Sequence, residues 1–164
     1  MSSREEILAL LRENARYSVE DLARQTGLDE DEVETTIEEL EAAGVVRGYQ
    51  AVVDWDSLAD DDERVRAQVE LNVTLDRETG YDDIAQRLAK FPEVRTLRLV
   101  SGDFDFAMEV EGDSMSEVSR FISEKVAPVP EITQTVTHYV MESYKEAGVE
   151  FGDGHDDDRL SVSP

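Results

Sequence analysis

The sequence predicts an α+β protein in two parts: a small domain of three helices, and a domain whose strands and helices follow in the order β-α-β-β-α-β. Three observations predict this fold class. Helix-capping signals recur in the first 44 residues, each followed by apolar residues three and four positions apart. Residues 65–75 alternate strictly between apolar and polar side chains, which is typical of a half-buried strand. Two helical patterns and three further β-rich segments follow.

The helices of the first part are expected to begin at residues whose side chains accept hydrogen bonds from the first helical turn. An acidic residue three positions later completes a capping box. The expected pairs are Ser3 with Glu6, Ser18 with Asp21, and Asp29 with Glu32. Gly27 and Gly44 are expected to end the second and third helices, because glycine adopts the left-handed conformation without strain.

The second part is expected to be ferredoxin-like, an antiparallel sheet with two helices on one face. Before it, residues 45–55 are β-rich and predict a wing or connecting strand, and the charged residues 56–64 predict a boundary. The expected segments are a helical domain at 1–52, a connector at 53–64, the ferredoxin-like domain at 65–145, and an acidic, disordered tail at 146–164.

The charge of the chain is strongly negative: 40 Asp and Glu stand against 16 Lys and Arg, for a formal net charge of −24. The electrostatic field of such a negative charge repels nucleic acids and anionic membranes in dilute buffer. Only three of the basic residues are Lys. An acidic, lysine-poor surface resembles proteins of extremely halophilic archaea, where molar salt reduces the screening length to about 3 Å. An acidic protein from an ordinary cytoplasm is the alternative.

The sequence lacks the residues that several classes of protein function require. The chain has no Cys, which excludes disulfides, thiolate metal sites and a cysteine nucleophile. No apolar run is long enough for a membrane span and no signal peptide is recognisable, so we expect a cytoplasmic protein without membrane contact. His138 and His155 do not form a metal-binding pattern, and no nucleophile or cofactor motif accompanies Asp103 and Asp105. We expect no metal, no cofactor and no enzymatic activity.

Residues 18–43 have the spacing of a helix-turn-helix, with Ala23 at the helix crossing, Gly27 at the turn and Val33 on the second helix. A plain three-helix core would have the same spacing. In a helix-turn-helix, the second helix enters the major groove of DNA. Here that helix is unusual, because residues 29–44 hold eight acidic residues and no Lys or Arg.

If this helix reads DNA, its outward residues near the N-terminal end should contact base edges, since Thr contacts either base type and Glu accepts from cytosine. The expected base contacts are Asp31, Glu34, Thr35, Thr36 and Glu38. Phosphate contacts are expected from Arg16, Arg24, Arg47 and Tyr49. Three arginines provide little positive charge for binding a polyanion such as DNA.

Two longer stretches resemble a known family. "ILALLRENARYSVEDLARQTGL" followed by "IEELEAAGVVRGYQAVVD" resembles the winged helix-turn-helix of the leucine-responsive regulatory protein/AsnC (Lrp/AsnC) transcription regulators. "VRTLRLVSGDFDFAMEVEGDSMSEVSRFISEKVAPVPEITQTVTHYVMESYK" is similar to the effector-binding RAM domain of that family. The resemblance covers roughly residues 4–145, and its most specific marker is the "SGDFDF" turn. The acidic second helix departs from the family, whose members usually carry Arg or Lys there.

The resemblance implies a sequence-specific DNA-binding regulator that pairs its sheets into dimers, assembles into tetramers or octamers, and responds to an amino acid or similar metabolite. The implied effector contacts are Ser101, Gly102, Asp103, Phe104 and Asp105 on the turn, with Gln134, Thr135 and Thr137 on the last strand. An aspartate could bind the ammonium group, and turn N–H or hydroxyl groups the carboxylate. A tight hairpin with solvated aspartates is the alternative for the turn. The rival function is an oligomeric metabolite sensor whose helical domain contacts protein.

Overall fold

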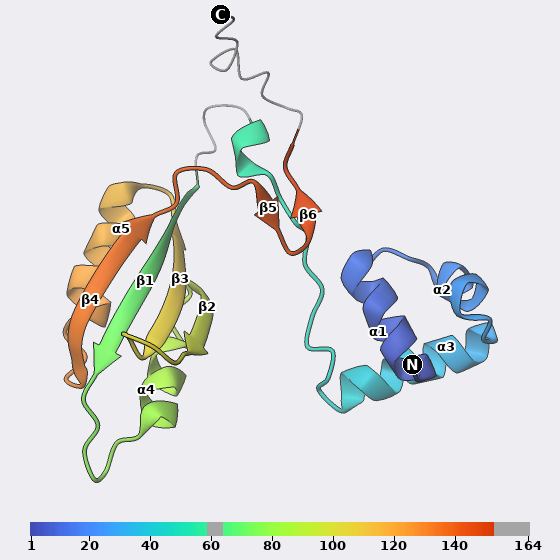
Figure 1. Cartoon of the computed structure of the whole chain (residues 1–164), viewed down its shortest axis with the longest axis horizontal. Helices are drawn as coiled ribbons and strands as arrows, with labels where there is room; N and C mark the ends of the chain where they lie inside the picture. Colours follow the sequence, from blue (N-terminus) through green and yellow to red (C-terminus); the bar gives the residue numbers. More distant parts are fainter. Residues whose placement is uncertain (59–63, 153–164) are drawn as a thin grey trace, which may run out of the picture. The chain divides into compact units, whose positions relative to one another are not determined.

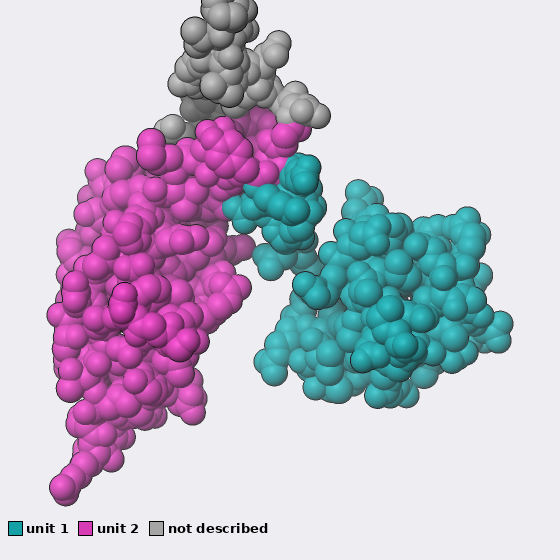
Figure 2. Space-filling view, in the orientation of Figure 1, with its two compact units in different colours: residues 1–53, 145–150 teal, residues 54–144, 151–164 magenta. Residues whose placement is uncertain are grey.

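The computed structural model describes residues 1–58 and 64–152. The chain divides into two compact units, residues 1–53 with 145–150, and residues 54–144 with 151–164 (Figures 1 and 2). The predicted loop at 56–64 and the predicted tail at 146–164 lie partly outside the described residues.

The first unit contains the three predicted helices, α1 (Ser3–Glu13), α2 (Val19–Thr26) and α3 (Glu30–Ala42). Their apolar faces meet in one small core. Its buried residues are Ile7, Leu22, Ala23 and Val33, with Leu10, Leu11, Tyr17, Val19, Leu28 and Ile37 packed around them. The spacing by four of Ile7 and Leu11, and of Val33 and Ile37, therefore matches the faces that meet in this core.

The helix starts match the sequence expectation at one of three positions. At α2 the capping box of Ser18 and Asp21 is confirmed, and the hydrogen bonds from Ser18 lower the pKa of Asp21. At α1 the box is formed by Ser2 and Glu5, one residue earlier than predicted, because the consecutive serines and glutamates offer the same spacing twice. At α3, Asp29 is the N-cap but its side chain makes no capping hydrogen bond, so the third predicted box is wrong.

The strand predicted over residues 45–55 is also wrong for this structure. The N–H groups of Val45 and Val46 both donate to Leu40 O, at 2.9 and 3.1 Å, and so close the end of α3. The chain then runs without a strand partner among the described residues as far as the 3₁₀ helix η1 (Trp55–Ser57). A β-rich segment needs a neighbouring strand for its backbone groups, and the described chain supplies none here.

The second unit has the predicted ferredoxin-like order, confirmed element by element (Figure 1). Its elements are β1 (Val65–Val73), α4 (Tyr81–Leu88), β2 (Val94–Leu99), β3 (Phe106–Gly112), α5 (Met115–Phe121) running into the π-helical turn η2 (Ile122–Val126), and β4 (Ile132–Tyr139). The sheet order is β2-β3-β1-β4, and the pairs β1–β3, β1–β4 and β2–β3 are antiparallel.

The core of this unit lies between one face of the sheet and the two helices. β1 contributes Ala67, Val69 and Leu71, and β3 contributes alternate residues beginning with Phe106. Helix residues such as Ile84 pack on them. The opposite face, which we call the open face, carries the polar set of the alternating strands, and neither helix of this unit lies on it.

The hairpin of β5 (Lys145–Glu146) and β6 (Val149–Glu150) follows β4. Its turn holds two consecutive residues at positive φ, Ala147 at 46° and Gly148 at 86°. This hairpin differs from the disordered tail that the sequence predicts from residue 146, because no apolar periodicity marks such short strands.

Candidate functional site

The helix-turn-helix of the first unit is held together at its turn. Gly27 has a φ of 75°, and its N–H donates to Ala23 O at 2.8 Å, so the chain leaves α2 in the left-handed conformation. The Thr26 hydroxyl donates to Leu22 O at 2.7 Å. Ala23 and Val33 are buried against each other's helices. The turn therefore sets the direction of α3 from α2.

The outward face of α3 carries the expected base-contacting residues. Asp31, Glu34, Thr35 and Glu38 are exposed. Thr36 is half-buried, and its hydroxyl already donates to Glu32 O at 2.7 Å. The helix has acidic side chains in its first turn and no basic residue in its last turn. Four of the five side chains predicted to contact bases are thus accessible, and the hydroxyl of the fifth, Thr36, is already hydrogen-bonded within the helix.

Most of the side chains that are expected to contact DNA phosphates already have a partner within this unit. Residues 1–53 hold five Arg against thirteen Asp and Glu. Arg24 pairs with Asp21, and Arg47 Nε donates to Gly44 O at 3.1 Å. Arg16 is exposed. The Tyr49 hydroxyl donates to Glu41 Oε1 at 2.7 Å, and this hydrogen bond raises the pKa of Tyr49.

The predicted effector turn joins β2 to β3, and Gly102 adopts a φ of 126° there. Ser101, Gly102 and Asp103 are exposed, whereas Phe104 is half-buried. Side-chain hydrogen bonds engage Asp105. Its Oδ2 accepts from Val73 N at 2.9 Å, and its Oδ1 accepts from the Tyr81 hydroxyl at 3.4 Å. The two aspartates of the turn therefore differ: Asp105 fastens the turn to β1 and α4, and Asp103 faces solvent.

The three predicted residues of β4 do not gather beside this turn. Thr135 pairs with Leu71 and Thr137 with Val69, so both threonines lie on the helix-covered face. Gln134 pairs with Asn72 and lies on the open face. β1 separates β4 from β3 in the sheet. Within one protomer the predicted effector residues are thus divided between two faces.

A feature that sequence reasoning missed is a hollow of about 210 Å³ on the open face. Its lining residues come from all four strands and from the effector turn: Gln68, Val69, Glu70, Thr96, Arg98, Phe104, Ala107, Met108, Glu109 and His138. The outward positions of the alternating strands signalled a polar face. The alternation within one strand does not give the register between strands, and this register decides which side chains are neighbours across the sheet.

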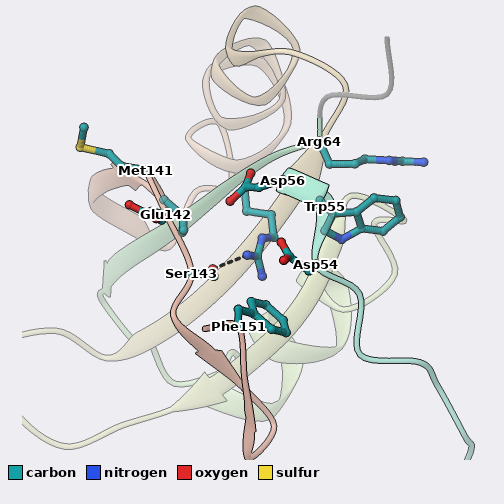
Figure 3. A pocket seen from close by; sticks show the side chains of 10 residues that line it. Asp54, Trp55, Asp56, Arg64, Met141, Glu142, Ser143 and Phe151 are labelled. Carbon is teal, nitrogen blue, oxygen red and sulfur yellow. Dashed lines mark hydrogen bonds between the residues drawn. The ribbon is translucent and has the colours of Figure 1, made fainter. Parts of the chain in front are cut away.

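A second, smaller hollow of about 30 Å³ lies where β1 begins (Figure 3). Arg64 stacks over the Trp55 ring at 5.5 Å, and Arg66 donates to the Ser143 hydroxyl. Phe151 N donates to Tyr144 O at 2.9 Å and brings its ring into this corner. Since this volume holds about one water molecule, the corner is a packing contact that fixes η1 to the sheet.

Among the residues that the structure describes, no helix is long and apolar enough to cross a membrane. Within the same residues, no group of three or more His, Cys, Asp or Glu side chains could hold a metal ion.

A helix-turn-helix joined to a ferredoxin-like domain is the organisation of a ligand-responsive transcription regulator. Residues 66–149 match the Lrp/AsnC ligand binding domain, and residues 5–41 match the AsnC-type helix-turn-helix domain. The HTH-type transcriptional regulator YugG of Bacillus subtilis (strain 168) is 39% identical over 159 residues, covering 97% of this chain and 95% of YugG. The chain belongs to the Lrp/AsnC family of DNA-binding transcription regulators.

Other relatives agree with this assignment. The proline dehydrogenase transcriptional activator of Rhizobium radiobacter is 30% identical over 143 residues, covering 87% of this chain and 90% of that protein. Among solved structures, LrpA of Mycobacterium tuberculosis has a TM-score of 0.73 at 21% identity, covering 90% of this chain and 96% of that one. The NMB0573/L-Met complex from Neisseria meningitidis has a TM-score of 0.69 at 21% identity, covering 89% and 92%. These two structures confirm the fold.

Proposed function

We propose that this protein is a sequence-specific regulator whose activity an amino acid or similar small metabolite tunes. The observation that carries the proposal is the joining of an α2–Gly27–α3 helix-turn-helix to a domain of the Lrp/AsnC ligand-binding type in one chain. The relative from Neisseria meningitidis was solved with L-Met, and a relative from Haemophilus influenzae, 26% identical, is a leucine-responsive regulatory protein. Both support small-molecule control.

We propose a separate role for each successive segment of the chain. Residues 1–52 bind DNA, residues 53–64 connect, and residues 65–145 bind the effector and assemble the oligomer. The acidic tail at 146–164 has no proposed role. On DNA, Thr35 and the exposed acids of α3 face the bases, and Arg16 contacts phosphate. Arg24 and Arg47 must exchange their present partners for phosphates to join it.

The proposed setting is the high-salt cytoplasm of an extremely halophilic archaeon. The excess of 40 acidic over 16 basic residues, with only three Lys, supports this setting. At molar salt the screening length is about 3 Å, so this charge density is compatible with a compact fold and with DNA nearby.

The DNA-binding proposal is tested by selecting operator sequences from random DNA with the full chain at molar KCl. We expect a defined sequence, and we expect Thr35→Ala to reduce the preference for it by about 1 to 3 kcal/mol, the usual worth of a good base contact. The matched control is Ser116→Ala, an exposed hydroxyl on α5 in the other unit, which should leave the preference unchanged. Failure to enrich any sequence at any KCl concentration would instead favour the protein-contacting sensor.

The proposed dimer, and any tetramer or octamer built from it, forms through the sheet domain. A sheet covered by helices on one face leaves its other face to be buried by a partner. Because this unit has a core of its own, a fragment lacking residues 1–52 should still be a dimer or larger in light scattering at high KCl. A monomeric fragment would contradict this mode of assembly.

A further inference from the structure

Two neighbouring rows of side chains cross the open face from strand to strand. Paired residues of antiparallel strands point to the same face of a sheet. The first row consists of Arg98, Ala107, Glu70 and Val136, and the second of Thr96, Glu109, Gln68 and His138. In the first row the methyl group of Ala107 stands between two long charged side chains. The face is therefore hollowed there, and Arg98 and Glu109 both line the hollow of about 210 Å³.

Most charged side chains on or beside the open face have a partner within the protomer. The internal contacts are Arg95 with Glu111 at 3.2 Å, Glu70 with the His138 imidazole at 3.5 Å, and Arg66 with the Ser143 hydroxyl. Arg98 and Glu109 are the exceptions, because neither has a hydrogen-bond or ion-pair partner in residues 1–58 and 64–152. Each protomer is left with one unpaired guanidinium and one unpaired carboxylate at the same hollow.

The proposed dimer buries this face, and burial of a charge is unfavourable unless the charge finds a partner. In a two-fold symmetric contact the same surface is used by both copies. Any group that Arg98 contacts in the second copy is therefore also contacted by Arg98 of the second copy in the first. With one unpaired cation and one unpaired anion in each copy, two symmetry-related ion pairs neutralise all four charges.

We propose that Arg98 of each copy enters the hollow of the other copy and pairs there with Glu109. The hollow is several times larger than the roughly 30 Å³ that a water molecule occupies in the liquid, so it admits the end of a long side chain. A guanidinium and a carboxylate favour a bidentate contact. The inference rests on the proposed function, because it needs the sheet-to-sheet dimer proposed there.

The two ion pairs make the open face selective for a second copy of this chain. A chain with like charges at positions 98 and 109 is rejected, because each cross-contact then places one unpaired or repelled charge in the interface. The partner is thus chosen by charge at two positions, on a face whose other charges are already paired internally.

The test uses Arg98→Glu and Glu109→Arg in the full chain, with dimer dissociation followed by light scattering over a dilution series in KCl. Each variant alone should dimerise at least about a hundredfold more weakly than the wild type, since two ion pairs worth roughly tenfold or more each are replaced by two like-charge contacts. An equal mixture of the two variants should dimerise like the wild type. In the mixed dimer one copy carries both carboxylates and the other both guanidinium groups, so both cross-contacts are ion pairs again.

The matched control is Arg95→Glu with Glu111→Arg, on the same two strands and with the same changes of charge. This pair lies within one protomer, at 3.2 Å. Mixing the two control variants should therefore not reverse the effect of either substitution on the dimer. Only a chain that carries both control substitutions regains its internal pair.

Two outcomes would overturn the ion pairs. If Arg98→Glu and Glu109→Arg each dimerise as tightly as the wild type, both side chains lie outside the contact and are left to solvent or a ligand. If each variant is weakened but their mixture is not restored, the two groups do not meet across the two-fold axis. A monomeric wild type would instead remove the proposed dimer itself, and selection of an operator by the wild type reports separately on the regulatory function.

Discussion

The affinity for a selected operator is expected to stay flat or rise as KCl increases from tenths molar to molar. Most DNA-binding proteins behave in the opposite way, because their cations release counterions from phosphates. Such a protein with six to ten phosphate contacts loses roughly a thousandfold or more in affinity over a fourfold rise in salt. Here the helical unit has five Arg against thirteen acids, and two of those Arg, Arg4 and Arg24, are paired within the unit.

The physical reason lies in α3. Its exposed Glu34 and Glu38 stand where the helix would approach DNA, and no basic residue accompanies them on the helix. In dilute buffer they repel phosphate, while at molar salt the repulsion is screened beyond about 3 Å. Potassium ions between carboxylates and phosphates would then be taken up on binding. Sequence preference would come from short-range contacts such as Thr35.

Replacing Glu34 and Glu38 with Gln should raise affinity at low KCl and make the slope of log affinity against log KCl more negative. The matched control is Asp82→Asn with Glu124→Gln, which removes the same charge from exposed positions in the other unit. If the control variant changes the slope as much as the α3 variant, the total charge is responsible rather than the helix. A steep loss of wild-type affinity with rising salt would contradict uptake of cations.

The elements that sequence predicted correctly are those whose signal lies in a single segment. The alternation of residues 65–75 predicted β1, and one of the two helical patterns after it is α4, whose Ile84 and Leu88, four positions apart, are both buried in the core. The strand expected at 45–55 failed because strand formation depends on a partner that the segment itself does not encode. The cap of α1 moved by one residue because Ser2 and Ser3 were equally suitable by spacing.

The candidate effector site was harder to predict because it depends on pairs of strands. Adjacent residues of a strand face opposite sides, so Gln134 and Thr135 cannot share one site in a protomer. Asp105 looked equivalent to Asp103, yet the end of β1 supplies it with the Val73 N–H. The hollow at Ala107 needed three strands in register before its neighbours could be named.

Phe106→Ala is expected to destabilise the sheet domain by about 3 to 5 kcal/mol, the usual cost of removing a buried aromatic ring. Phe106 is 1% exposed, and its ring forms a T-shaped pair with the Tyr81 ring, with the two centroids 6.0 Å apart. Few domains exceed a total stability of about 15 kcal/mol, so this loss is a large fraction. Because Phe106 directly follows Asp105, the effector turn should lose its fixed position as well.

The measurement is denaturant unfolding of the full chain in KCl, followed by the fluorescence of Trp55, the only Trp, which lies in the second unit. A probe in one unit is needed, because two units need not unfold in a single transition. Leu99→Ala is the matched control: Leu99 pairs with Phe106 across β2 and β3 but is 55% exposed, so its loss should stay below about 1 kcal/mol. Equal losses in the two variants would mean that Phe106 does not anchor the core between the sheet and its helices.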